Sequence, residues 1–189
     1  MEEISKWSNR FTWTAIIQGA IVTALAIMLT TVVITSSSAQ NLVSIVLGNP
    51  AVGFIEIAAL TGLGLYIIVG VIATGLSAQF YHHFEIRLGK EYGRRKVANS
   101  LAWAHLILMN VGIAAASMIM IYGGYLGDFA VSSEEESGYG WGWTIEQASE
   151  HILNPLIIPV GVMLLIASIG AICGGIGFVI VNLKKGDIR

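Results

Sequence analysis

The residue best placed to do chemistry in this chain is a histidine inside a long apolar stretch. His105 lies within Ala102-Trp-Ala-His-Leu-Ile-Leu-Met109, where an imidazole can ligate a haem iron or make a hydrogen bond between helices. A haem b with two histidine ligands needs a second histidine at similar depth, and the candidates are His82 and His83. At about 1.5 Å per residue these two differ from His105 in depth by roughly 13 Å, which favours the hydrogen-bonding role. His105 with His83 remains the alternative, cofactor-binding pair.

Two further polar residues interrupt the apolar stretches. Glu56 lies near the start of one stretch, and Asn110 follows His105 in another. A carboxylate inside a membrane span can belong to a proton path, and together with Asn110 it would line a polar path across the membrane. The position of Glu56 near the end of its stretch favours the simpler interpretation that its carboxylate reaches water at the interface.

Motifs for the common catalytic and metal sites are absent from the sequence. It contains no phosphate-binding loop, no nucleophile–base pair and no closely spaced Cys/His metal motif. The single cysteine, Cys173, lies in an apolar stretch, so no internal disulfide can form. We therefore predict no catalytic residue, no metal and no resident cofactor, with haem b as the alternative.

Four long apolar stretches must position these residues. They cover about 12–34, 53–80, 100–126 and 153–183. Each exceeds the ~20 residues that a helix needs to cross a ~30 Å hydrocarbon core. With 55% hydrophobic residues, 12% charged residues and a mean hydropathy of +0.75, the chain lies outside the range of soluble globular proteins. We predict an all-α, polytopic membrane protein, a bundle of four transmembrane helices that forms one domain over residues 1–189 in the lipid bilayer.

A short helix is predicted just before the fourth stretch. Thr144 with Gln147 three positions later fits a capping box, in which each side chain satisfies a backbone N–H group of the other residue. The pattern therefore predicts that a helix begins at this point.

Basic residues are sorted to one side of the four stretches. Of the ten lysines and arginines, Lys6 and Arg10 precede the first stretch, three follow the fourth, and the others lie between the second and third. Because Lys and Arg are retained in cytoplasmic loops, this pattern predicts a multi-pass protein of the cell membrane with both termini in the cytoplasm. The same rule accounts for the basic residues of 87–96, so we predict no binding to nucleic acid, which needs a concentrated basic face.

Small residues mark the faces on which helices should pack. Gly170 and Gly174 form a GxxxG pattern in the fourth stretch, and Gly112 precedes a run of alanines in the third. Glycine lets two helix backbones approach closely where lipid removes the hydrophobic drive for association. We therefore expect either a tight bundle or a docking face on a larger complex, in which the face with Gly170 and Gly174 would contact a helix of a partner subunit.

One stretch, and the order of features around it, resembles a known family. Ala102-Trp-Ala-His-Leu-Ile-Leu-Met-Asn-Val-Gly112 is similar to the Ala-x-x-His-x-x-x-Met-x-x-Gly stretch of the haem–copper oxidase catalytic subunit. The four stretches then resemble its last four helices. Where that family places a His-x-His pair of haem ligands, this chain has Glu56-Ile-Ala58. The resemblance therefore implies a relative that lacks the haem and copper ligands and is not an oxidase by itself.

Three functions fit these observations. The leading hypothesis is a non-catalytic helical subunit of a larger membrane redox or respiratory complex, which contributes assembly and helix packing to other membrane subunits. A small b-type cytochrome or quinone-interacting membrane anchor that uses His105 is the first alternative, and a visible spectrum distinguishes it. A homo-oligomeric channel or transporter with Glu56 and Asn110 along its path is the second. The scarcity of polar residues within the stretches counts against it.

Overall fold

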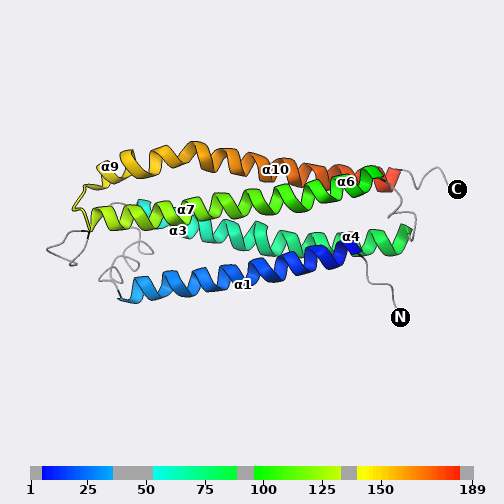
Figure 1. Cartoon of the computed structure of the whole chain (residues 1–189), viewed down its shortest axis with the longest axis horizontal. Coiled ribbons are helices and arrows are strands. Elements are labelled where there is room, and N and C mark those ends of the chain that lie inside the picture. The colour runs from blue at the N-terminus through cyan, green and yellow to red at the C-terminus, as the bar shows by residue number, and fades with distance from the viewer. Residues whose placement is uncertain (1–5, 36–52, 89–95, 133–139, 184–189) are drawn as a thin grey trace. The chain divides into compact units, whose positions relative to one another are not determined.

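Every described part of the chain is helical or connects two helices. The computed structural model describes residues 6–35, 53–88, 96–132 and 140–183, and no strand occurs within these ranges (Figure 1). The helical elements are α1 (Lys6–Thr35); α3 (Gly53–Leu65), η1 (Tyr66–Ala73) and α4 (Thr74–Leu88); α6 (Lys96–Ala104), η2 (His105–Met109) and α7 (Asn110–Val131); α9 (Ile145–Ala148), η3 (Ser149–Leu153) and α10 (Asn154–Leu183). The η elements are π-helical and join their neighbours into continuous helices.

Four helices in the described ranges are long and apolar enough to cross a membrane. The candidate spans are Lys6–Thr31, Ile57–Ile86, Lys96–Val131 and Ile145–Ile180. This confirms the prediction of an all-α chain with four membrane-spanning helices, and so of a multi-pass membrane protein. The helices continue past the apolar stretches of the sequence, because their backbone hydrogen bonding does not stop where the first charged residues appear.

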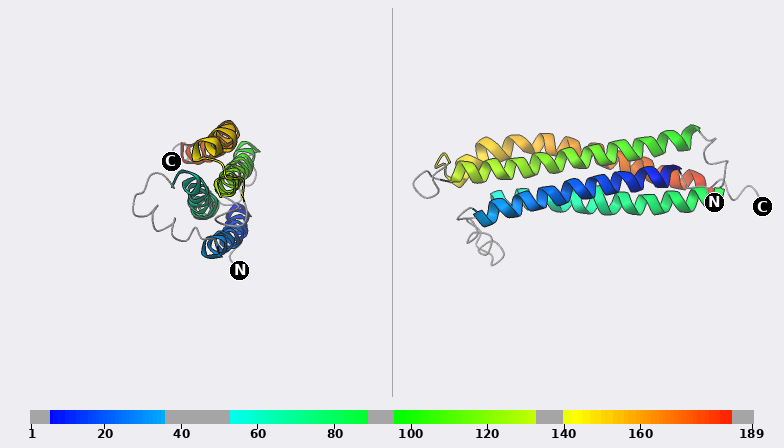
Figure 2. Two further views of the ribbon diagram at one scale, coloured as in Figure 1. Left: turned by 90° about the vertical axis from the view of Figure 1, so that its left-hand side faces the viewer. Right: turned by 60° about the horizontal axis from the view of Figure 1, so that its bottom comes forward.

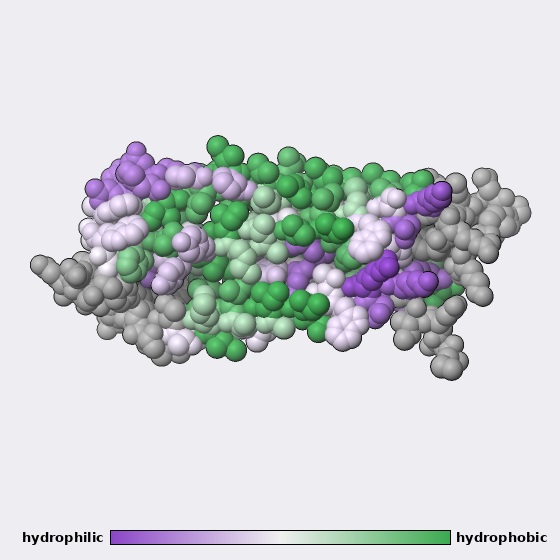
Figure 3. All heavy atoms as spheres, in the orientation of Figure 1, coloured by the Kyte–Doolittle hydropathy of each residue, from purple (hydrophilic) through white to green (hydrophobic). Residues whose placement is uncertain are grey.

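Hydrophobic side chains cover much of the outside of these helices. Ile158 is 75% exposed and Ile86 is 64% exposed, and Figure 3 shows hydrophobic residues over the helices and hydrophilic residues gathered toward the helix ends. Lipid tails are the natural contact of such side chains. In the most apolar window of each span, the third span has 50% of its residues buried, whereas the first and fourth have 11%. The helix built by α6, η2 and α7 is therefore the most enclosed.

The chain divides into two compact units, and each span contributes to both. The first unit takes its described residues from Met1–Ala20, Ile67–Ala114 and Met163–Arg189. The second takes them from Ile21–Tyr66 and Ala115–Val162. The prediction of one membrane domain over residues 1–189 stays a prediction.

The first unit has an aromatic and alanine core to which all four helices contribute. Its buried residues come from α1, α4, α6 and η2, and Phe178 of α10 packs against them. Figures 1 and 2 show the ribbons of the helices that supply these residues running alongside one another. The buried members are Trp7, Phe11, Ala78, Tyr81, Phe84, Ala98, Ala102 and Leu106. The alanines of α6 let the large rings of α1 and α4 lie close to its backbone. Segments of four helices thus pack together within this unit.

The second unit is held by glycine contacts and by a folded connection. A Cβ atom at Gly62 of α3 would lie 2.8 Å from the backbone oxygen of Ser117, so α3 and α7 touch closely there. The Trp143 N–H donates to the Ala130 carbonyl at 2.8 Å, which ties the start of the following segment to the end of α7. The predicted capping box is confirmed, since the Gln147 N–H donates to Thr144 Oγ1 while the Thr144 N–H donates to Gln147 Oε1.

Two of the π-helical segments lie in or border the first unit, and each is followed by a polar residue. Thr74 follows η1 and Asn110 follows η2. A π-helical turn holds one residue more than an α-helical turn and often occurs at functional sites. Both polar side chains meet in the centre of the first unit.

Candidate functional site

Three amide and hydroxyl side chains meet inside the first unit. Asn110 Oδ1 accepts hydrogen bonds from Gln18 Nε2 of α1 and from Thr74 Oγ1, the latter at 2.7 Å. Asn110 Nδ2 donates to the Leu106 carbonyl at 2.7 Å. Asn110, Gln18 and Thr74 are 7%, 6% and 0% exposed, so the network is closed to the surroundings of the chain. Three helices are thereby linked by polar groups in an otherwise apolar interior.

One atom of this network is left without a partner. Gln18 Oε1 is buried and accepts no hydrogen bond from the described residues. An unpaired buried acceptor costs free energy, because it has lost its hydrogen bonds to water. Asn110 was predicted from the sequence as a polar residue of the interior, whereas Gln18 and Thr74 were not. The available signal for Gln18 was a lone glutamine within an apolar stretch, which does not reveal its partner.

His105 lies in the same unit, enclosed by aromatic rings and by the backbone of α10. Its side chain is 4% exposed, and its Nδ1 atom lies 3.3 Å from the Tyr81 hydroxyl. The rings of Phe11 and Phe178 lie with their centroids 5.0 and 6.2 Å from the imidazole centroid. An imidazole in this setting is held by one hydrogen bond and by ring packing.

Gly174 of α10 makes room for the His105 ring. A Cβ atom placed on Gly174 would overlap the imidazole, including its Cε1 atom at 2.6 Å. The ring therefore lies directly on the α10 backbone, and the space on its Nδ1 side is filled by the chain itself.

His83 does not approach His105. Tyr81 of α4 faces His105, and a residue two positions later on an α-helix points about 200° away around the helix axis. His83 is accordingly exposed, and its ring contacts Phe84 with the centroids 6.0 Å apart. His82 is exposed as well. The structure thus does not assemble the two-histidine pair that was the alternative cofactor site.

The glycine face of α10 is occupied by the same chain. A Cβ atom at Gly170 would meet the backbone of Leu108 and Met109, and one at Gly112 would lie 2.6 Å from the backbone nitrogen of Ala167. The helix of α6, η2 and α7 therefore packs backbone to backbone against α10 at Gly112, Gly170 and Gly174. These contacts are those of the predicted tight bundle, and the prediction of partner subunits stays a prediction, because a GxxxG pattern indicates close helix contact without telling which helix makes it.

Two remaining predictions concern Glu56 and metal binding. Glu56 lies in α3, and its side chain falls outside the described part of the structure. Within the described ranges, no group of three or more His, Cys, Asp or Glu residues is placed to hold a metal ion. The described polar residues of the interior are suited to hydrogen bonding between helices.

Comparison of the chain with models of protein families, with curated proteins and with solved structures finds no match. The resemblance to the haem–copper oxidase catalytic subunit therefore stays a prediction.

Proposed function

We propose that this chain is a non-catalytic helical subunit of a larger membrane redox complex, to which it contributes helix packing. The observation that carries the proposal is the enclosure of His105, the interior residue whose side chain is best suited to ligation or catalysis. Its ring lies on the α10 backbone at Gly174 and its Nδ1 atom faces the Tyr81 hydroxyl. A group held in this manner stabilises a fold and has little freedom to react.

The polar network around Asn110 supports the same conclusion. Its members bond to one another across three helices, and Asn110 uses both its oxygen and its nitrogen in doing so. A residue that lined an open path would instead present these atoms to water or to a transported ion. The redox assignment itself comes from the family resemblance of residues 102–112. The cytoplasmic location of both termini comes from the distribution of the basic residues.

The experiment is isolation of the full chain from its native membrane in a gentle detergent, with identification of the chains that co-purify. We expect a stoichiometric complex whose visible absorption follows the partner chains when the subunits are separated, leaving this chain colourless. A Soret band that stays with this chain and disappears in the His105→Ala variant would contradict the proposal and support a b-type cytochrome. Recovery of the chain as a free homo-oligomer, with no redox partner, would contradict it in favour of a channel or transporter.

A further inference from the structure

A cation at the start of α1 contacts two tryptophan rings of the first unit. The Arg10 guanidinium carbon lies 4.6 Å from the centroid of the Trp7 ring and 4.7 Å from that of the Trp103 ring. The two rings meet edge to face, with their centroids 5.2 Å apart and an interplanar angle of 83°. Trp7 and Arg10 belong to α1 and Trp103 belongs to α6, so the arrangement joins two helices. We call these three residues the arginine clamp.

The clamp is built on a fixed support. Trp7 is only 3% exposed, and its backbone N–H donates to both carboxylate oxygens of Glu85 at 3.2 Å. Trp103 is 41% exposed and Arg10 is exposed. The Glu85 carboxylate accepts hydrogen bonds from the α1 backbone and is also attracted by the charge of Arg10. The two rings approach the guanidinium from one side, and the Arg10 side chain remains exposed.

The guanidinium keeps its hydrogen-bond donors. Among the described residues, none accepts a hydrogen bond from the Arg10 side chain, and the interaction of Arg10 with Glu85 is one of charge alone. A guanidinium presents five N–H donors in a plane, and this geometry matches two oxygens of a phosphate or carboxylate. Because the Arg10 side chain is exposed beside the two rings, its N–H donors can reach such an anion.

The location of the clamp selects the kind of anion. Arg10 and Trp103 lie near the starts of the candidate spans Lys6–Thr31 and Lys96–Val131. Tryptophan at such positions sits at the level of the lipid headgroups, where phosphate is the abundant anion. Lys6 lies one turn before Arg10, Lys96 lies two turns before Trp103, and both lysines are exposed. These charges lie on the headgroup side of the clamp and add to the attraction for an anionic lipid.

We propose that the arginine clamp is a binding site for the phosphate group of an anionic phospholipid, which the Arg10 guanidinium contacts through its outer edge. The site is independent of the proposed redox complex, because every residue in it belongs to this chain. Lipid bound here would bridge α1 and α6 and so stabilise the first unit.

The test measures lipid binding to the purified full chain by native mass spectrometry. Phosphatidylglycerol competes with a galactosyl diacylglycerol that has the same acyl chains and no phosphate. We expect the wild-type chain to retain phosphatidylglycerol preferentially. The preference should fall about tenfold in Arg10→Gln, since hydrogen bonds to a charged group are lost, and it should also fall in Trp103→Leu, in which the guanidinium is no longer oriented.

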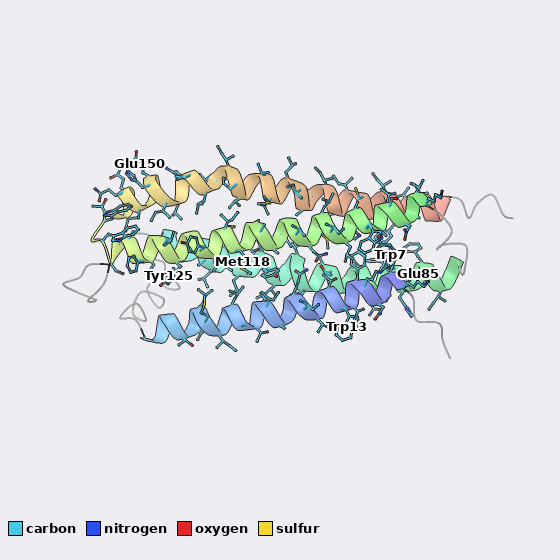
Figure 4. The ribbon with its side chains drawn as sticks, viewed as in Figure 1. Trp7, Trp13, Glu85, Met118, Tyr125 and Glu150 are labelled. Atoms are coloured by element: carbon cyan, nitrogen blue, oxygen red, sulfur yellow. The ribbon has the colours of Figure 1, made fainter. Side chains whose placement is uncertain are left out.

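Matched control variants distinguish lipid binding at the arginine clamp from general electrostatic attraction. Lys6→Gln removes the same charge outside the clamp, and Trp13→Leu removes a tryptophan of α1 that is 58% exposed and points away from the other helices (Figure 4). Both should keep most of the preference. Arg10→Lys retains the positive charge and provides a second test if Arg10→Gln fails to fold. It should bind phosphatidylglycerol more weakly than the wild type, because an ammonium group lacks the planar edge of a guanidinium.

Three results would overturn the proposal. The first is an equal loss of preference in Arg10→Gln and Lys6→Gln, which would indicate general electrostatic attraction. The second is an absence of preference in the wild-type chain. The third is a rise in melting temperature with inorganic phosphate as large as that with phosphatidylglycerol, which would indicate a site for free phosphate.

Discussion

The backbone N–H of Trp7 donates to both carboxylate oxygens of Glu85, a residue 78 positions away in the chain (Figure 4). Trp7 is the second residue of α1, and the first N–H groups of a helix have no partner within that helix. A carboxylate is also favoured at this end by the helix dipole. The end of α4 thus caps the beginning of α1.

Removal of this cap should destabilise the first unit. We expect Glu85→Ala to lower the free energy of unfolding by about 1 kcal/mol, as loss of a helix cap commonly does. Glu85→Gln should lose less, because its amide oxygen can still accept from the Trp7 N–H. The measurement is reversible unfolding of the purified chain in mixed lipid–detergent micelles. Equal stability of Glu85→Ala and the wild type would show that the cap contributes nothing.

The contact between Gly174 and His105 predicts opposite effects at two adjacent glycines. Gly174→Ala places a methyl group on the imidazole and should cost about 1–3 kcal/mol through overpacking. Gly175→Ala meets no atom within 4 Å and should be neutral or slightly stabilising, because alanine favours a helix by up to ~1 kcal/mol over glycine. Unfolding of both variants provides the comparison. The double variant with both His105→Ala and Gly174→Ala should lose less stability than the sum of the two single variants, because the methyl group no longer meets the imidazole. Losses that add strictly would contradict the contact.

The polar network predicts an order of severity between two of its members. Asn110→Ala removes the acceptor for Gln18 and Thr74 and the donor to Leu106, so it should cost about 1–3 kcal/mol. Gln18→Met should cost less, because it removes an unpaired buried oxygen along with one hydrogen bond and keeps most of the side-chain volume. Both values come from the same unfolding measurement. A larger loss for Gln18→Met would mean that Gln18 Oε1 is paired in the membrane.

The distribution of basic residues predicts which ends of the helices face the cytoplasm. In a Cys173→Ala background, Glu146→Cys should react with an impermeant thiol reagent added to intact cells, because the connection that contains it lacks Lys and Arg. Lys96 begins the third span and lies on the predicted cytoplasmic side of the membrane. Lys96→Cys is the matched control and should react only after permeabilisation. Both residues are exposed in the structure. Reversed labelling of the pair would refute the assigned orientation.

The sequence was sufficient for local features and insufficient for those that depend on distant contacts. Hydropathy alone located the four spanning helices, and the spacing of Thr144 and Gln147 predicted the capping box. The glycine pattern correctly predicted close helix packing but did not decide between a tight bundle and a docking face, since small residues carry no information about the neighbouring helix. The Gln18–Asn110 hydrogen bond joins residues 92 positions apart. No local pattern predicts such a pair, because it depends on how far each helix is rotated about its axis.

The π-helical segment η1 makes the second span sensitive to where its length changes. A π-helical turn holds one residue more than an α-helical turn, so the loss of one residue from Tyr66–Ala73 can be absorbed if the segment becomes α-helical. A deletion between Thr74 and Tyr81 falls in α-helix, where no extra residue is present, and would turn the residues after it by about 100° about the helix axis. Tyr81 and Glu85 would then point away from His105 and Trp7. In a lineage of such chains, a change of length would therefore be accepted within η1 more readily than between Thr74 and Tyr81.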